Sequence, residues 1–305
     1  MVGVSLPVIT LVGATATGKS SLAIELARAL RQAGQPAEVV NADSMLVYRG
    51  MDIGTAKPTT EEQSGVVHHL IDIMDLGQTA SVAVFQELAR AAIADCRARG
   101  VLPIVVGGSA LYLHAIIDQF VFPPTDEVVR ARLTGELETI GAEAMYARLQ
   151  QADPDAAAGI EPANSRRIIR ALEAIELSGT FRSTLPTWTY ALDNVHQIGL
   201  QIDREEMDRR IAIRVEAMWR QGLVKEVRAL LDQGLRDSPT ACRAIGYRQV
   251  IAYLDGTISE TEAQQLTIIK TRQFSRKQLS WWKRDPRISW LDLGAQPSAV
   301  LALIG

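Results

Sequence analysis

Short apolar runs alternate with longer amphipathic segments over roughly the first 120 residues of the chain. The runs have the length and β-branched content of buried strands, and they predict strands at Val8–Val12, Ala37–Ala42, His69–Ile73 and Leu102–Val106. Between them, apolar residues recur every three or four positions and predict helices over Lys19–Gln32 and Val82–Arg99. Apolar strands separated by helices indicate an α/β fold, a parallel sheet with helices on both faces.

The pattern changes at Pro123-Pro124, after which strand-like runs are absent until about residue 195. The spacing in this stretch predicts helices over Asp126–Leu137, Ala142–Gln151 and Asn164–Leu177. A strand follows at His196–Ile202, and later segments predict helices over Glu205–Gln221, Val224–Gln233, Tyr247–Leu254 and Ser259–Trp282, with a last strand at Ile288–Leu291. We therefore expect an α/β core of residues 1–122 and 195–305, interrupted by an all-helical inserted domain at 123–194.

The first predicted strand runs directly into a phosphate-loop motif, a Gly, four residues and then Gly-Lys-Ser, followed by a helix. The residues expected to bind phosphate are Gly13, Ala14, Thr15, Ala16, Thr17, Gly18, Lys19 and Ser20. The two glycines let backbone N–H groups curl around an anion at the helix N-terminus. Lys19 offers a charge to the terminal phosphates, and the Ser20 hydroxyl is a candidate Mg²⁺ ligand. The sequence thus predicts a P-loop NTPase-like site for a di- or triphosphate.

The composition narrows the choice of partners. No apolar run approaches the roughly 20 residues that span a bilayer, so we expect no membrane insertion and a cytoplasmic protein. Cys96 and Cys242 lie far apart, which argues against a disulfide scaffold or a zinc site. The formal net charge is −3, yet Lys270–Arg287 is strongly basic and contains Trp281 and Trp282. This segment is either a nucleic-acid footprint or a solvated helix face carrying two core tryptophans.

Asp43, at the end of the second predicted strand, is the best candidate for an acidic group beside the phosphate loop. It is either a functional carboxylate or a turn residue, since Asp-Ser after a strand is common turn chemistry. From the motif alone, a P-loop kinase of a small metabolite and an RNA-binding module that holds nucleotide structurally both remain open.

The stretch Asn41–Pro58 resembles the signature of tRNA dimethylallyltransferases, also called tRNA isopentenylpyrophosphate transferases. The resemblance continues, in the family's order and spacing, at His68–Asp72, Val106–Tyr112, Ala244–Gln249, Thr271–Gln273 and Arg276–Trp281. Ala14, Thr17 and Ser20 depart from the family's usual Pro, Ser and Thr, but the two hydroxyls are kept. Without a C-terminal zinc-finger extension, the chain resembles the bacterial members.

The resemblance implies transfer of a dimethylallyl group from dimethylallyl diphosphate to N6 of the adenosine at tRNA position 37, with Mg²⁺ as cofactor. Asp43 is then the general base, acting with Lys19, Ser109, Arg130 and Arg243 near the reacting groups. The residues expected to contact tRNA are Asp43, Ser44, Met45, Leu46, Arg166, Arg167, Ile168, Ile169, Arg170, Cys242, Arg243, Ala244, Ile245, Gly246, Tyr247, Arg276, Lys277, Gln278 and Lys283. We expect a monomer, and a structural role for His68 and His69.

Overall fold

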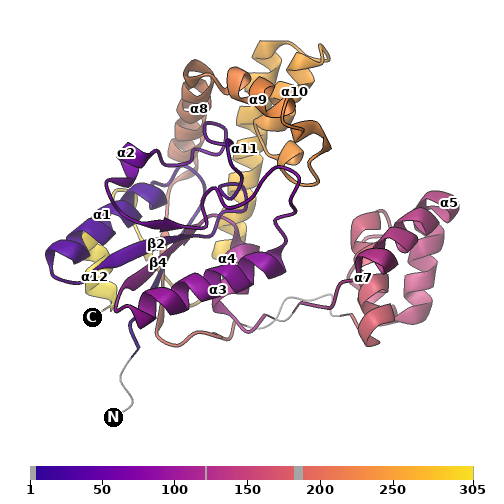
Figure 1. Cartoon of the computed structure of the whole chain (residues 1–305), viewed down its shortest axis with the longest axis horizontal. Coiled ribbons are helices and arrows are strands. Elements are labelled where there is room, and N and C mark those ends of the chain that lie inside the picture. Colours follow the sequence, from indigo (N-terminus) through magenta and orange to yellow (C-terminus); the bar gives the residue numbers. More distant parts are fainter. Residues whose placement is uncertain (1–4, 121, 182–187, 305) are drawn as a thin grey trace. The chain divides into compact units, whose positions relative to one another are not determined.

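The computed structural model of the chain describes residues 5–120, 122–181 and 188–304. It divides into two compact units (Figure 1): the core unit, residues 1–118 with 190–305, and the helical unit, residues 119–189. The helical unit begins and ends slightly earlier in the chain than the inserted domain expected at 123–194.

The core unit is built on a six-stranded parallel sheet with the strand order β3-β2-β4-β1-β5-β6. Its strands are β1 (Val8–Val12), β2 (Ala37–Asn41), β3 (His68–His69), β4 (Leu102–Gly107), β5 (Val195–Leu200) and β6 (Ile288–Leu291). The predicted α/β class is confirmed. The longer strand predicted at His69–Ile73 is wrong, because Leu70 and Asp72 adopt left-handed φ angles of 63° and 55°, which cannot continue a strand.

Helices cover both faces of the sheet (Figure 1). On one face, Ile9 and Leu11 of β1 pack with the apolar side of α1 (Lys19–Gln32) and with α12 (Pro297–Ile304). On the other, Val8 and Val12 pack into the cluster that contains α3 (Val82–Ala98) and α4 (Ala110–Ile117). The sequence pattern missed α4, because nearly all its residues are apolar and buried and leave no helical period to detect.

A group of helices follows β5. It comprises α8 (Arg204–Gln221), α9 (Leu223–Leu231), α10 (Tyr247–Leu254) and α11 (Glu260–Trp282). The long α11 packs against both α8 and α10. Asp203 caps α8 by accepting a hydrogen bond from the Glu206 N–H, and a Ser259–Glu262 capping box starts α11. The short helix α2 (Thr60–Gln63) lies earlier in the chain, between β2 and β3.

The helical unit has its own core. It contains α5 (Glu127–Ala152), α6 (Pro154–Ala158) and α7 (Ser165–Ser178). Gly141, at φ 82°, kinks α5 and divides it into two segments that correspond to the two predicted helices. Leu133, Met145 and Leu149 of α5 pack against Ile168 and Leu172 of α7 and are all buried.

Candidate active site

The phosphate loop curls because three of its residues take positive φ angles: Gly13 at 145°, Ala16 at 66° and Gly18 at 85°. At Gly13 the loop also runs against β5, where an added Cβ would lie 2.9 Å from the Leu200 carbonyl oxygen. This backbone path leads into the N-terminus of α1, whose unpaired N–H groups and dipole favour an anion. The predicted phosphate loop therefore has the geometry that its motif requires.

Two cations lie against the loop. The Lys19 ammonium donates to the Ala14 carbonyl oxygen at 2.5 Å, and Arg214 of α8 donates to the Thr15 hydroxyl at 3.2 Å. Burial, reinforced by the charge of Arg214, lowers the pKa of Lys19 to about 7, against a smaller raising effect of Asp43. A buried lysine beside a mostly buried arginine is an electrostatic arrangement that an anion stabilises. The sequence pattern does not reveal Arg214 as a loop residue, because only the packing of α8 brings it to the loop.

Asp43 follows the end of β2 and is fixed by a local turn. Asn41 accepts a hydrogen bond from the Asp43 N–H at 2.8 Å, and Asp43 Oδ1 accepts one from the Met45 N–H at 2.9 Å. Burial raises the pKa of Asp43, while the Met45 N–H and the charge of Lys19 oppose that shift. The carboxylate thus shares the electrostatic environment of Lys19 and has a proton affinity above that of an ordinary aspartate, as suits a base.

Gln278 of α11 joins the loops that follow β1 and β4. Its Oε1 accepts a hydrogen bond from the Thr15 N–H, and its Nε2 donates to the Gly108 carbonyl oxygen, both at 2.9 Å. The contact is so close that a Cβ at Gly108 would lie 2.4 Å from Nε2. Because Gln278 is buried with its amide committed to these two loops, it does not fit the predicted role in contacting tRNA. Ser109, next along the chain, is half-buried and caps α4 with its backbone alone.

Two segments of the family-like signature meet around Glu226 of α9. Its carboxylate accepts hydrogen bonds from the N–H groups of Asp52, Ile53 and Gly54, and from the Tyr247 hydroxyl at 2.6 Å. Tyr247 is buried, and burial together with the Glu226 charge raises the pKa of its phenol. Tyr247 therefore links the 52–54 turn to α10 through Glu226. Its buried side chain is not available for the predicted contact with tRNA.

Other members of that second segment are accessible. Arg243 is exposed, and it has no ion pair with any residue in the described ranges. Cys242 is half-buried and donates to the Ser238 carbonyl oxygen at 2.9 Å. Ala244 and Gly246 are buried and Ile245 is half-buried. Residues 244–246 therefore offer a ligand mainly backbone N–H and C=O groups. Near Asp43, residues Ser44, Met45 and Leu46 are half-buried at the end of β2.

The basic segment Lys270–Arg287 separates into structural and exposed residues. Trp282 is fully buried, and Arg287 forms ion pairs with the buried carboxylates of Asp118 and Asp285. Arg276 pairs with Asp208 of α8 at 2.9 Å. Lys277 and Lys283 are exposed and make no ion pair within the described part of the chain. The segment thus contains both buried or paired structural residues and exposed cations, and its predicted contact with nucleic acid stays a prediction.

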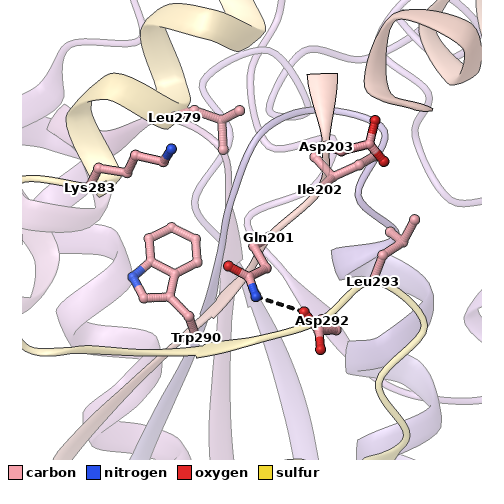
Figure 2. Close-up of a pocket in the computed structure, with 8 residues that line it drawn as sticks. All are labelled: Gln201, Ile202, Asp203, Leu279, Lys283, Trp290, Asp292 and Leu293. Carbon is pink, nitrogen blue, oxygen red and sulfur yellow. Dashed lines mark hydrogen bonds between the residues drawn. The ribbon is translucent and has the colours of Figure 1, made fainter. Parts of the chain in front are cut away.

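A pocket of about 660 Å³ lies beside the ends of β5 and β6 (Figure 2). It is lined by Gln201, Ile202, Asp203, Leu279, Lys283, Trp290, Asp292 and Leu293. In the sheet order, β5 and β6 lie on one side of β1, whereas β2, which leads to Asp43, lies on the other. The residues that line the pocket thus include neither Asp43 nor any residue of the phosphate loop.

In the helical unit, Glu173 of α7 is fully buried and binds two arginines. Arg130 donates to its carboxylate at 2.9 Å and 3.1 Å, and Arg170 donates at 2.9 Å. Arg170 also donates to the carbonyl oxygens of Pro123 and Pro124. Both arginine side chains thus neutralise an internal carboxylate. The sequence pattern did not reveal these ion pairs.

The remaining residues predicted for tRNA contact on α7 differ in their exposure. Ile168 is fully buried in the core of the unit, so its predicted contact with tRNA is not compatible with the structure. Ile169 is half-buried, whereas Arg166 and Arg167 are exposed. Only these two arginines of the helix present accessible cationic groups.

Ser20 is the described residue best suited to hold a divalent metal at the phosphate loop. Its side chain is exposed at the start of α1, and its hydroxyl forms no hydrogen bond with the described residues. A hydroxyl oxygen beside a phosphate site is a ligand suited to Mg²⁺, a hard cation that retains waters and phosphate oxygens in its shell. The residues present therefore fit a Mg²⁺ ion.

Fold and site together define a phosphate-loop α/β protein in which a carboxylate shares the electrostatic environment of a cationic anion site. The chain belongs to the family described as IPP transferase, whose sequence model matches residues 46–285. It is 53% identical over 289 residues to the tRNA dimethylallyltransferase of Cutibacterium acnes, covering 95% of this chain and 91% of that protein. The tRNA dimethylallyltransferase of Kineococcus radiotolerans is 54% identical, with 94% and 91% covered.

Solved structures give the same family. The full-length tRNA isopentenylpyrophosphate transferase of Bacillus halodurans matches with a TM-score of 0.70 and 39% identity, over 98% of this chain and 94% of that one. A eukaryotic dimethylallyltransferase acting on tRNA matches with a TM-score of 0.76 and 26% identity, over 95% and 74%. These relatives do not support the small-metabolite kinase. No described helix has the length and apolar content needed to span a membrane.

Proposed function

We propose that this protein transfers a dimethylallyl group from dimethylallyl diphosphate to N6 of the adenosine at tRNA position 37 and releases pyrophosphate. The observation that carries the proposal is the buried Lys19, which donates to the loop and shares its electrostatic environment with Arg214 and the Asp43 carboxylate. The positive charges of Lys19 and Arg214 suit the binding of a diphosphate. The Asp43 carboxylate suits the removal of a proton from an amine.

The exocyclic amine of adenine is a weak nucleophile, because its lone pair is delocalised into the ring. Asp43 orients this amine and accepts its proton as the new C–N bond forms, while the allylic C–O bond breaks. Lys19, Arg214 and the loop N–H groups stabilise the charge that develops on the departing pyrophosphate. A Mg²⁺ ion held by Ser20 would add positive charge at the diphosphate.

We propose that tRNA is bound by exposed cations near and beyond the site. The candidates are Lys277, Lys283 and Arg243 in the core unit, and Arg166 and Arg167 in the inserted helical domain. Base flipping brings the target adenosine out of its stack, since N6 cannot otherwise reach a donor bound on the loop. Ser109 remains a proposed contact to the reacting groups, whereas the Arg130 guanidinium is already bound to Glu173 within the helical unit. We also propose that the protein acts as a monomer in the cytoplasm, where its tRNA substrate is found.

The test is incubation of the purified protein with unmodified tRNA, Mg²⁺ and dimethylallyl diphosphate labelled in the prenyl carbons. We expect label in tRNA, located at the adenosine 3′ of the anticodon by nuclease digestion and mass spectrometry. A parallel reaction with ATP labelled in its γ-phosphate addresses phosphoryl transfer. Label transferred from ATP to a small molecule, with none in tRNA from the prenyl donor, would contradict the proposal.

A further inference from the structure

Three potential metal ligands meet at the edge of the sheet, at the opposite end of β2 from Asp43. They are Glu38 near the start of β2, His69 on the edge strand β3 and Cys96 near the end of α3. Cys96 Sγ lies 3.5 Å from Glu38 Oε2 and 3.7 Å from His69 Nε2, and these last two atoms are 2.7 Å apart. Long separations along the chain hide this cluster from any search for closely spaced ligands.

These separations are close to those of a tetrahedral zinc site. Bond lengths of about 2.3 Å to sulfur and about 2.0–2.1 Å to nitrogen or oxygen place sulfur about 3.6 Å from each of the lighter ligands. The two distances from Cys96 already have this value. Only the hydrogen-bonded contact between His69 and Glu38 must open, by roughly 0.6 Å. Because His69 and Glu38 are partly exposed, with side chains 24% and 12% accessible, an ion can enter from solvent.

Arg99 is the group that competes with a metal ion. Its guanidinium donates to both oxygens of Glu38, at 2.9 Å and 2.7 Å, and lies 3.7 Å from Cys96 Sγ. These hydrogen bonds lower the pKa of Glu38 to about 2, so the carboxylate is ionised and ready to bind. Burial raises the pKa of the Cys96 thiol to about 12, so a metal must displace its proton.

We propose that Glu38, His69 and Cys96 form a binding site for a borderline-soft divalent cation of the Zn²⁺ type, with water as the fourth ligand. A thiolate and an imidazole select such ions over Mg²⁺, which prefers oxygen ligands. In the bound state, Arg99 keeps its hydrogen bond to Oε1 and releases Oε2 to the metal. The site is structural and independent of the proposed reaction, because none of its ligands belongs to the phosphate loop or to the Asp43 turn.

The test is titration of the whole, metal-free protein with Co²⁺, followed by displacement with Zn²⁺, at fixed pH. We expect one equivalent of Co²⁺ to give a thiolate-to-cobalt charge-transfer band and the visible bands of tetrahedral cobalt, both removed by Zn²⁺. Cys96→Ser should abolish the charge-transfer band and weaken Zn²⁺ binding by more than about tenfold. Cys242→Ser, which changes the other cysteine, is the matched control and should leave both unchanged.

The Arg99→Gln substitution should change the affinity for Zn²⁺ in the opposite direction. Removing the competing positive charge should tighten Zn²⁺ binding by roughly fivefold or more, whereas a merely damaged structure would weaken it. Circular dichroism of each variant checks that the fold is kept. A charge-transfer band that persists in Cys96→Ser, or equal affinities in the natural protein, Cys96→Ser and Arg99→Gln, would overturn the proposal. Mg²⁺ at the same concentration should not displace Co²⁺, and displacement would contradict the assigned class of ion.

Discussion

The phosphate loop and the basic segment of α11 both carry the positive charge expected of a tRNA prenyltransferase, but they use it differently. In the loop, Lys19 is buried and donates to the Ala14 carbonyl oxygen, and the charge of Arg214 acts on it. Along α11 and just beyond it, the charges are spread over the surface, and several are already paired. Arg276 is held by Asp208, and Arg287 by Asp118 and Asp285.

Burial and pairing decide which of these charges are available for a ligand. A buried cation without a full counter-charge is strongly stabilised when an anion binds, because little water screens the interaction between them. An exposed lysine contributes to tRNA binding chiefly through counterion release, which is modest for each residue and depends on salt. We therefore expect large effects on turnover around the loop and small, salt-dependent effects on affinity along α11.

The largest effect is expected at Asp43. Asp43→Asn keeps an oxygen for the Met45 N–H but removes the ionised base, so turnover should fall by about 10²-fold or more while donor and tRNA binding stay nearly intact. In the natural protein, the raised pKa of Asp43 should shift the acid limb of the pH–rate profile above that of an ordinary aspartate. Single-turnover rates and filter binding measure the two quantities. Near-normal turnover in Asp43→Asn would refute the base assignment.

The next largest effect is expected at the buried Lys19 and the partly buried Arg214. Lys19→Ala and Arg214→Ala should each lower kcat/KM by roughly 10²-fold, because both stabilise the diphosphate in the bound and transition states. Arg209→Ala is a matched control on the same helix, since Arg209 is exposed, pairs with Glu206 and forms no hydrogen bond with the phosphate loop in the described part of the chain. If all three arginine and lysine variants behaved alike in steady-state kinetics, the loop would not be the donor site.

Lys19 also predicts a pH dependence of donor binding. Its pKa is about 7 in the free protein, and a bound diphosphate should raise it, so binding takes up a proton above pH 7. Affinity should therefore weaken as the pH rises above about 7, and calorimetry in buffers of different ionisation enthalpy should detect the proton. Lys19→Gln should remove that part of the pH dependence. An unchanged pH profile in this variant would show that Lys19 does not titrate on binding.

An intermediate effect is expected at Gln278, whose amide forms hydrogen bonds with the backbone of Thr15 and Gly108 and, among the described residues, with no charged side chain. Gln278→Ala should lower kcat by roughly tenfold, since the loops after β1 and β4 lose their shared hydrogen bonds and misplace the reacting groups. Affinity for tRNA should hardly change, because the side chain is buried. Separate measurement of kcat and tRNA affinity distinguishes this positioning role from the tRNA contact expected from the sequence. Selective loss of tRNA affinity would restore the earlier interpretation.

The smallest effects are expected along α11. Lys277→Ala and Lys283→Ala should each reduce the salt slope of log affinity for tRNA by somewhat under about 1, whereas Arg276→Ala should change it less because Asp208 already neutralises it. Arg243→Ala should instead lower turnover more than affinity. Filter binding over a salt series compares the four variants. Unchanged slopes for both lysines would make this face merely solvated and leave tRNA binding to other surfaces.

Much of the core could be predicted because its signals are local. Val8–Val12, Lys19–Gln32, Tyr247–Leu254 and Ile288–Leu291 form the elements expected of them, since strand and helix periods depend on neighbouring residues. The short β3 and the buried α4 could not be predicted as reliably. Left-handed φ angles at Leu70 and Asp72 end β3, and α4 is apolar on all sides.

Contiguous residues are enough to identify the phosphate loop, the carboxylate after β2 and the family, because the backbone and chemistry of each are local. How the separate charges are used depends on the packing of the folded chain. It brought Arg214 to the loop, committed Gln278 to Thr15 and Gly108, and paired Arg130 and Arg170 with the buried Glu173. The physical reason is that a side chain's availability depends on its partners and its burial, and those come from elements far away in the chain.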